Sequence, residues 1–246
     1  MRVLALDSST ALGSAALVED DRVLVERQGD ASRPYAARLP GELLDVLEEA
    51  AAPLASVDAF AVAVGPGSFT GLRIGIASMQ GLAQVTGRPM VAVTVLEALG
   101  ALAAAGCRSG DLVGAWVDAH RGDVYSALYA VAEAPPFSLE RLVERDPPRV
   151  GPPEEIARHW TAADGLAAHR RLHALAGDGA VLYAECAGRL CIERSGVVNP
   201  PALAGALGRL AVSRHRAGGG VSPSAIQPLY VRRPDVEIAR ERARRG

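Results

Sequence analysis

The amino-acid sequence predicts an α/β protein built from two lobes. Its 246 residues suffice for one large domain or two small ones. Hydrophobic residues make up 49% of the chain and charged residues 22%, a composition that is typical of globular proteins and excludes a disordered chain. Strand-like and helix-like segments alternate, and the alternation restarts with strands near residue 112. Two halves of similar size, each opening with strands, therefore indicate two α/β lobes.

The first half opens with three strand-like runs, residues 2–7, 13–18 and 22–27, which we expect to pair as a meander. Apolar residues spaced three and four apart then predict a helix over residues 35–52. Beyond it the expected elements alternate, in the order strand 58–64, helix 71–85, strand 90–94 and helix 95–105.

The second half follows a short linker at residues 107–110. Strands are expected at 112–118 and 123–131, followed by proline-rich loops at 134–136 and 146–153. A partly helical stretch over 154–173 precedes a short apolar run, and a helix is expected over 200–216. We therefore expect three parts, namely an N-terminal lobe, a C-terminal lobe and a C-terminal segment with a basic tail, over residues 1–106, 107–220 and 221–246.

Composition narrows the classes of function. A net charge of −2 and an aromatic content of 4% argue against a protein that binds nucleic acid independently. All 26 basic residues are arginine, which excludes lysine-dependent chemistry. Residues 232–246 hold six arginines against three acids, a balance of +3, so this tail is either a solvated arm or a contact for an acidic partner such as RNA.

The sequence also predicts a cytoplasmic location without membrane contact. The apolar run after Met1 is too short for the core of a signal peptide, and no apolar run reaches the length of a membrane span. The three cysteines, Cys107, Cys186 and Cys191, follow no disulfide or zinc spacing and are expected to be reduced thiols.

The most distinctive segment runs from Val64 to Gly75. It predicts a strand end, a glycine turn and a helix start, with Ser68 or Thr70 as the helix cap. A capped tight turn is favoured over an anion site, although free helix N–H groups could hold an anion. The segment matches neither a Walker loop nor a dinucleotide-binding fingerprint. Its candidate functional residues, which we call the signature loop, are Gly65, Pro66, Gly67, Ser68, Phe69, Thr70, Gly71 and Arg73.

As a string, this segment resembles the signature of the TsaB family, also called YeaZ, which serves bacterial tRNA threonylcarbamoyladenosine synthesis. Four other stretches are similar to that family in the same order: residues 7–10, 117–125, 177–180 and 228–232. His120 stands where the family pattern has arginine. The resemblance covers residues 3–232, whereas residues 134–170 and those after 233 match nothing in the pattern.

The resemblance implies an actin-like (ASKHA) fold, in which each lobe is a mixed sheet with flanking helices. It also implies a non-catalytic partner and scaffold of the paralogue TsaD, with TsaE in a ternary complex and tRNA bound through that complex. The product would be the threonylcarbamoyl group on the adenosine beside the anticodon of tRNAs that read codons beginning with A. A homodimer in isolation stays open. The alternatives are a self-sufficient ATP-dependent kinase or ATPase of the same fold and, less favoured, an M22-type metallopeptidase.

The resemblance places no catalytic or metal site in this chain. TsaD holds its metal through a histidine pair on the first long helix, but residues 31–44 contain no histidine here. His169 and His173 have ligand spacing, yet two arginines lie between them and no third ligand is apparent, so a solvated helix face is favoured.

A vestigial nucleotide cleft is the remaining candidate for small-molecule binding. Acids in the turns of such a fold hold Mg²⁺ while backbone amides take phosphates, and the candidates are Asp7, Ser8, Ser9, Thr10 and, in the second lobe, Asp118. The alternative is that Asp7 and Ser9 only cap the turn. We expect no resident cofactor, with weak ATP or ADP binding left open.

The helix over 71–85 carries the candidate partner interface. One face is apolar and an adjacent face holds small residues that would permit close helix approach. The lobe itself could cover these faces, but the resemblance favours a partner that packs on the first two helices. The expected contacts are Leu39, Leu43, Val46, Gly71, Leu72, Gly75, Ile76, Ser78, Met79 and Leu82.

Overall fold

The first half of the chain forms one sheet, in the order β3-β2-β1-β4-β5. The computed structural model describes residues 1–162, 171–192, 196–229 and 231. The three opening strands pair antiparallel, and the last two join parallel beside β1. The strands are β1 (Arg2–Asp7), β2 (Ser14–Glu19), β3 (Arg22–Gln28), β4 (Ala59–Ala63) and β5 (Met90–Val93). The predicted meander and the strands that follow it are confirmed.

The second half forms another sheet, in the order β10-β9-β6-β7-β8. Its strands are β6 (Leu112–Asp118), β7 (Val124–Val131), β8 (Leu142–Gly151), β9 (Ala174–Ala176) and β10 (Val197–Val198). The expectation of a loop at 146–153 was wrong for most of that stretch, because β8 runs through Pro147 and Pro148. β8 is an edge strand paired only with β7, with register shifts near Leu128, and such a strand tolerates proline.

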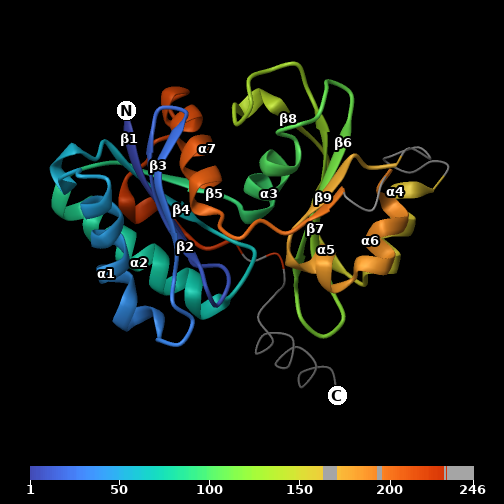
Figure 1. The fold of residues 1–246 in the computed structure, drawn as a ribbon, viewed down its shortest axis with the longest axis horizontal. Coiled ribbons are helices and arrows are strands. Elements are labelled where there is room, and N and C mark those ends of the chain that lie inside the picture. The colour runs from blue at the N-terminus through green and yellow to red at the C-terminus, as the bar shows by residue number, and fades with distance from the viewer. Residues whose placement is uncertain (163–170, 193–195, 230, 232–246) are drawn as a thin grey trace.

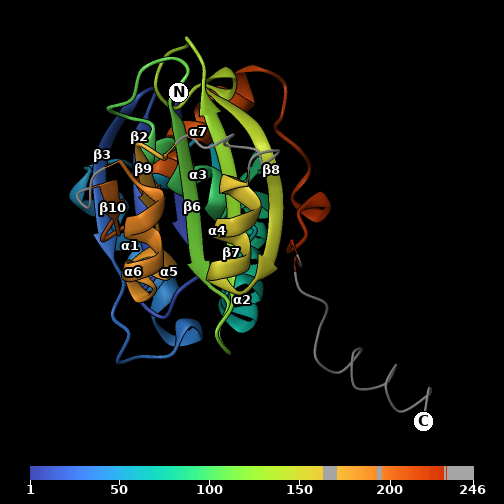
Figure 2. The same ribbon diagram turned by 90° about the vertical axis from the view of Figure 1, so that its right-hand side faces the viewer.

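Helices and sheets alternate in layers across the molecule (Figure 1). α1 (Tyr35–Glu49) and α2 (Phe69–Thr86) cover the outer face of the first sheet, and α3 (Val95–Ala103) and α7 (Ala204–Arg216) lie between the two sheets. Figure 2 shows the opposite side, where α4 (Pro153–Thr161), α5 (Asp178–Leu182) and α6 (Ala184–Leu190) cover the second sheet. The expected helix 200–216 thus begins four residues later, at Ala204.

The two faces of the first sheet differ in the size of their side chains. Small residues such as Ala5, Ala16 and Ala61 face the layer of α3 and α7, while large ones such as Leu4 and Phe60 face α1 and α2. Successive residues of a strand point to opposite faces, so an alternation of alanine with larger residues gives this arrangement directly. The inner helices therefore approach the sheet closely, and Gly208 of α7 leaves no room for a Cβ beside Val18.

The C-terminal part of the chain returns to the first sheet. α7 packs on β1 and β2, and the backbone N–H groups of Leu203 and Ala204 donate to Ser14 Oγ at 3.1 and 3.0 Å. Val221 exchanges backbone hydrogen bonds with Met90, and the Leu229 N–H donates to the Val64 carbonyl at 2.7 Å. The expected division at residues 106 and 220 stays a prediction, but α7 lies against the first sheet although it comes from the second half.

Most of the residues that were expected to contact a partner on α1 and α2 are buried within the lobe. Eight of the ten residues are buried inside the lobe itself, and only Ser78 and Leu82 are partly exposed. Leu39, Leu43 and Met79 pack with β1, β2 and β4 in one core cluster. The small-residue face approaches the chain's own backbone, because Gly71 and Gly75 lie against the turn at Ser8. The buried residues are Leu39, Leu43, Val46, Gly71, Leu72, Gly75, Ile76 and Met79.

The cysteines and the helices were also the subject of expectations from the sequence. Cys107, Cys186 and Cys191 are free, and the latter two are buried. In the described part of the chain, no helix is both long enough and apolar enough to span a membrane.

Two glycines of α2 provide a test of this packing. A Cβ at Gly75 would lie 2.8 Å from Ser8 Cβ and closer still to its hydroxyl, whereas a Cβ at Gly81 would meet nothing within 4 Å. Gly75→Ala should therefore destabilise the chain by about 1–3 kcal/mol through overpacking. Gly81→Ala should stabilise it by up to about 1 kcal/mol, because alanine is the better helix former. Urea unfolding of both variants measures this, and equal effects at the two sites would contradict the packing described.

Candidate functional site

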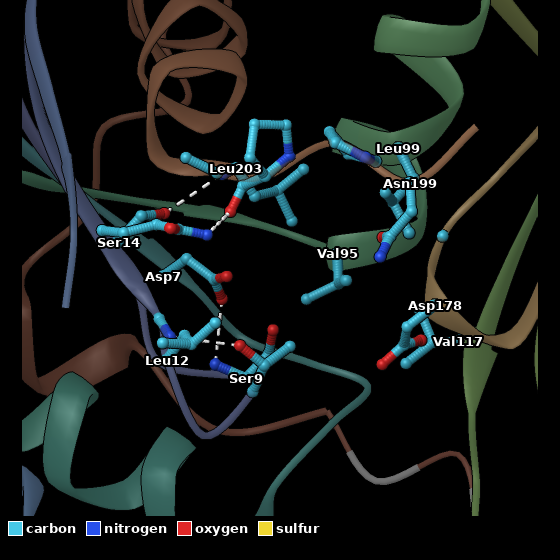
Figure 3. Close-up of a pocket in the computed structure, with 17 residues that line it drawn as sticks. Asp7, Ser9, Leu12, Ser14, Val95, Leu99, Val117, Asp178, Asn199 and Leu203 are labelled. Carbon is cyan, nitrogen blue, oxygen red and sulfur yellow. Dashed lines mark hydrogen bonds between the residues drawn. The ribbon is translucent and has the colours of Figure 1, made fainter. Parts of the chain in front are cut away.

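A cavity of about 230 Å³ lies between the two lobes (Figure 3). One wall holds Asp7, at the end of β1, and Ser9, in the turn that follows it. The second lobe contributes Val117, Asp178 and Asn199 on the opposite wall. Val95, Leu99 and Leu203 supply apolar surface from α3 and from the start of α7. The cavity thus lies where β1 and β6 end and where the two lobes meet, which is where the sequence predicted a cleft.

Asp7 ends β1 and is 4% exposed. Its Oδ1 accepts a hydrogen bond from the Ser9 N–H at 2.9 Å. Burial raises the pKa of the Asp7 carboxyl above its usual value, and the nearby carboxylates of Asp178 and Glu26 raise it further. Hydrogen bonding with Ser9 acts in the opposite direction but does not cancel the effect of burial.

The neighbouring residues of the turn have different surroundings. Ser8 faces α2, where it lies against Gly75, and its hydroxyl has no partner among the described residues. Ser9 is 4% exposed and lines the cavity. Thr10 also lines it, and its Oγ1 accepts a hydrogen bond from the Gly13 N–H at 3.1 Å. The alternative in which Asp7 only caps the turn explains the bond to Ser9 but not the position of its carboxyl beside the cavity.

Asp178, rather than the expected Asp118, faces Asp7 from the second lobe. Asp118 is outside the cavity lining, and its carboxylate accepts the His120 N–H at 2.8 Å and lies 3.0 Å from His120 Nδ1. Asp178 accepts the backbone N–H groups of Asp118 and Gly179 at 2.9 and 2.8 Å. A sequence signal for Asp178 exists, because it follows β9 at the glycine turn just as Asp7 ends β1.

The signature loop positions the first wall of the cavity. Ser68 caps α2, since its Oγ accepts the Gly71 N–H at 3.2 Å, which confirms the capped turn with Ser68 rather than Thr70 as the cap. The Ser68 N–H donates to the Ser9 carbonyl at 2.7 Å. Gly67 has φ +154°, and a Cβ there would lie 2.5 Å from the same carbonyl oxygen. An anion site was the less favoured alternative for this loop, and nothing in the described residues tests it.

The remaining loop residues lie around this turn. Gly65 and Pro66 are joined by a cis peptide bond, and Gly65 approaches the Leu229 carbonyl. The Arg73 guanidinium stacks over the Phe69 ring at 3.9 Å, and Thr70 is exposed. The side chains of Phe69, Thr70 and Arg73 are exposed and lie outside the cavity lining.

Histidine and acidic side chains do not gather elsewhere in the described residues. No group of three or more His, Cys, Asp or Glu in this part of the chain is placed to hold a metal ion. His173 Nε2 lies 3.3 Å from Asp111 Oδ1, so a single carboxylate accompanies this histidine. The other histidine of the sequence pattern, His169, lies outside the described residues.

The raised pKa of Asp7 predicts a pH-dependent effect on stability. Between the ordinary carboxyl pKa and the raised one, the folded chain binds more protons than the unfolded chain, so the stability of the parent falls as pH rises through this window. Asp7→Asn removes the buried charge and keeps an acceptor for Ser9. It should stabilise the chain at pH 8 by about 1 kcal/mol, or roughly 2–4 °C in Tm.

The difference between parent and variant should shrink as pH falls toward the ordinary carboxyl pKa, because the raised pKa of Asp7 lets the buried carboxyl of the parent take up its proton there. The two pH values compared are 8 and 4. Calorimetric melting at both pH values measures the difference. The control is Asp45→Asn, since the Asp45 side chain is exposed on α1. This substitution should change the free energy of unfolding by less than about 0.5 kcal/mol. A Tm difference for Asp7→Asn that is the same at both pH values would count against a buried charge at this position.

Comparison with known proteins places the chain in a family. A family described as "TsaD: tRNA N6-adenosine threonylcarbamoyltransferase" matches residues 27–134. An uncharacterized protein of Mycobacterium bovis is 32% identical over 239 residues, which cover 96% of this chain and 93% of that protein. The tRNA threonylcarbamoyladenosine biosynthesis protein TsaB of Escherichia coli is 37% identical over 129 residues, or 52% of this chain and 55% of that protein.

Solved structures agree with this assignment. YeaZ from Pseudomonas aeruginosa is 32% identical, with a TM-score of 0.71 over 93% of this chain and 99% of that one. An activator of 2-hydroxyisocaproyl-CoA dehydratase from Clostridium difficile shares the fold alone, at 7% identity and a TM-score of 0.50. The predicted fold class, two lobes that each hold a mixed sheet with flanking helices, is confirmed. With more than 30% identity over nearly the whole of a YeaZ structure, the chain belongs to the TsaB (YeaZ) family.

Proposed function

We propose that this chain is a non-catalytic partner of TsaD in forming the threonylcarbamoyl group on tRNA. The observation that supports this most strongly is the match to proteins named for tRNA threonylcarbamoyladenosine biosynthesis, TsaB of E. coli and of Bacillus subtilis, at 37% and 33% identity. The modified base is the adenosine beside the anticodon of tRNAs that read codons beginning with A. The chain acts in the cytoplasm, with TsaE joining the complex and tRNA binding to the assembly.

The first helix supports a non-catalytic role. TsaD would place its metal-binding histidines in the stretch that corresponds to residues 31–44, which here contains none. Arg38 instead donates to the Ala11 and Leu12 carbonyls at 2.9 and 2.7 Å and pairs with Glu42. The Tyr35 hydroxyl donates to the Thr10 carbonyl. These side chains brace the turn after β1, so α1 has a structural task in place of metal binding.

The exposed sides of α1 and α2 are the surface that we assign to TsaD. On α2, the residues four apart from Phe69 to Val85 all face solvent, and the two small ones, Ala77 and Gly81, permit close approach of another helix. On α1, Leu44 is likewise exposed. The partner face is therefore a stripe different from the buried one predicted from sequence, and it consists of Ala37, Gly41, Leu44, Phe69, Arg73, Ala77, Gly81 and Val85.

The assignment is tested by co-purification of the chain with TsaD from the same cell, and by nucleoside analysis of tRNA after depletion of the chain. We expect a stable complex and loss of threonylcarbamoyladenosine. The kinase alternative requires ATP turnover by the purified chain alone, and the metallopeptidase alternative requires a bound metal. Normal levels of the modified nucleoside after depletion would overturn the proposal.

Charges placed on the partner face should block the complex without harm to the fold. Leu44 is 60% exposed and Val85 is 87% exposed, so Leu44→Glu and Val85→Glu remove little core packing. Each should weaken TsaD binding about tenfold or more, because a partner helix would have to desolvate the new carboxylate. Calorimetric titration with TsaD measures the affinity.

Leu182→Glu is the matched control, since Leu182 on α5 is 59% exposed and lies on the second lobe. It should leave TsaD affinity within about twofold of the parent. If all three variants bind TsaD with the parent's affinity, the interface lies elsewhere. Sedimentation of the isolated parent and of Leu44→Glu shows whether the chain forms a homodimer and whether this face is needed for it.

A further inference from the structure

A second pocket, of about 200 Å³, lies between α3, α7 and the strands β7 and β8, which are neighbours in the second sheet (Figure 1). Val95 and Leu99 of α3 line the cavity between the lobes, whereas Thr94 and Glu97 line this pocket. The two hollows therefore lie on different sides of α3. The second one, which we call the α3–β8 pocket, is lined chiefly by Glu97, Tyr129, Leu142, Glu144, Leu210 and Arg214.

Tyr129 supplies the observation that points to a ligand. It is 3% exposed, and its ring packs on α3, where a Cβ at Gly100 would lie 2.8 Å from the ring. Its hydroxyl has no hydrogen-bond partner among the described residues, yet it is not completely enclosed, so it opens into the pocket that the side chain lines. A buried hydroxyl without a partner is costly. A ligand atom that forms a hydrogen bond with it would therefore be favoured.

Two carboxylates lie near the Tyr129 hydroxyl. Glu144 is directly opposite Tyr129 in the pairing of β7 with β8, so the two side chains point to the same face of the sheet. Glu97 belongs to α3, and both carboxylates act on the hydroxyl through their charge, without a hydrogen bond to it. Burial raises the pKa of Tyr129 far above its usual value, and the two charges raise it further, so the hydroxyl keeps its proton at neutral pH.

The charges around the pocket favour a cation. The Arg214 guanidinium donates to the Ala92 carbonyl at 2.5 Å and to Glu97 Oε1 at 2.7 Å, and Glu97 Oε2 accepts the Thr94 N–H at 2.9 Å. The charges of Arg214 and Glu97 therefore offset each other. Glu144 is exposed and has no ion-pair partner among the described residues. One carboxylate thus stays uncompensated beside a hydroxyl that has no partner.

The rest of the lining narrows the class of cation. Leu139, Leu142 and Leu210 present apolar surface to the pocket. A guanidinium group is planar, holds its N–H donors in a fixed fork and is more weakly hydrated than an ammonium group, so it suits two neighbouring acceptors beside an apolar wall. A volume of about 200 Å³ is below the roughly 300–1,000 Å³ of sites that hold drug-sized molecules. The ligand is therefore small, with one cationic head and a short apolar part.

We propose that the α3–β8 pocket binds the guanidinium group of a small organic cation, which donates to the Glu144 carboxylate and to the Tyr129 hydroxyl. The short apolar part of the ligand packs against Leu142 and Leu210. The pocket is built from the second sheet and from the helices between the sheets, so it lies apart from the proposed partner face on α1 and α2. The proposal concerns the isolated chain and does not depend on its role with TsaD.

The test is a titration of the full chain with ethylguanidinium chloride at constant ionic strength, followed by the NMR shifts of the Gly100 and Glu144 amides. Propylammonium chloride, a different cation, and sodium propionate, an anion, are titrated in parallel. We expect ethylguanidinium to bind with a Kd of about 1 mM, as fits so small a ligand, and propylammonium to bind about threefold more weakly. Propionate should shift neither amide, and the Ser9 amide, in the cavity on the other side of α3, should not respond to ethylguanidinium.

Variants assign the contacts. Glu144→Gln should weaken ethylguanidinium binding about tenfold or more, because a charge-assisted hydrogen bond is lost. Tyr129→Phe keeps the ring on Gly100 and removes only the hydroxyl, so it should weaken binding about threefold or more. The Tm of this variant should not fall, since the hydroxyl has no partner in the chain to lose. Glu155→Gln, which removes an exposed charge from α4 on the other face of the second sheet, is the control and should bind like the parent.

Three results would overturn the proposal. The first is unchanged affinity in both pocket variants, and the second is binding of propylammonium or propionate at least as tight as that of ethylguanidinium. The third is a lower Tm for Tyr129→Phe, because it would show that the hydroxyl already has a partner within the chain.

Discussion

The turn at Ser8 and Ser9 crosses the start of α2 so closely that three glycines there have no room for a side chain. A Cβ at Gly67 would meet the Ser9 carbonyl oxygen, and one at Gly71 or Gly75 would meet Ser8. Their spacing of four puts the two helical glycines on one side of α2. The Ser68 N–H, which donates to the Ser9 carbonyl, closes the contact. Because this contact fixes the end of β1, it also fixes where Asp7 lies, and so the glycines of the signature loop hold one wall of the cavity without lining it.

Local periodicity was enough to predict two α/β lobes, because the strands of the first sheet alternate small and large residues and the helices are amphipathic. Periodicity failed where small residues indicate that another element packs closely but do not identify that element. The stripe of Gly71 and Gly75 indicated close approach, and the approaching element is the chain's own turn rather than a partner. Similarly, Pro147 and Pro148 suggested a loop, since the sequence does not reveal that β8 is an edge strand.

Only one of the two facing aspartates of the candidate site, Asp7, could be predicted from the sequence. Asp7 ends a buried strand and begins a polar turn, a pattern that is typical of a cleft. The choice between Asp118 and Asp178 depends on which of two neighbouring strand ends faces the other lobe, and that is set by the parallel pairing of β6 with β9. Asp118 is turned instead toward His120, which has φ +57° in the hairpin turn. Long-range pairing of this kind leaves no local trace in the sequence.

The proposed partner face and the cavity lie on opposite sides of the first sheet. Alternate residues of β1 pack toward α1 and α2 on one side and toward α3 and α7 on the other. A partner seated on the exposed side of α2 would therefore leave the space between the lobes open. The link between the two regions is the contact of Ser68 and the α2 glycines with Ser8 and Ser9, which has no spare volume for adjustment. A close-packed contact transmits displacement and does not absorb it, so a shift of the turn at Ser8 and Ser9 would be passed on to the start of α2.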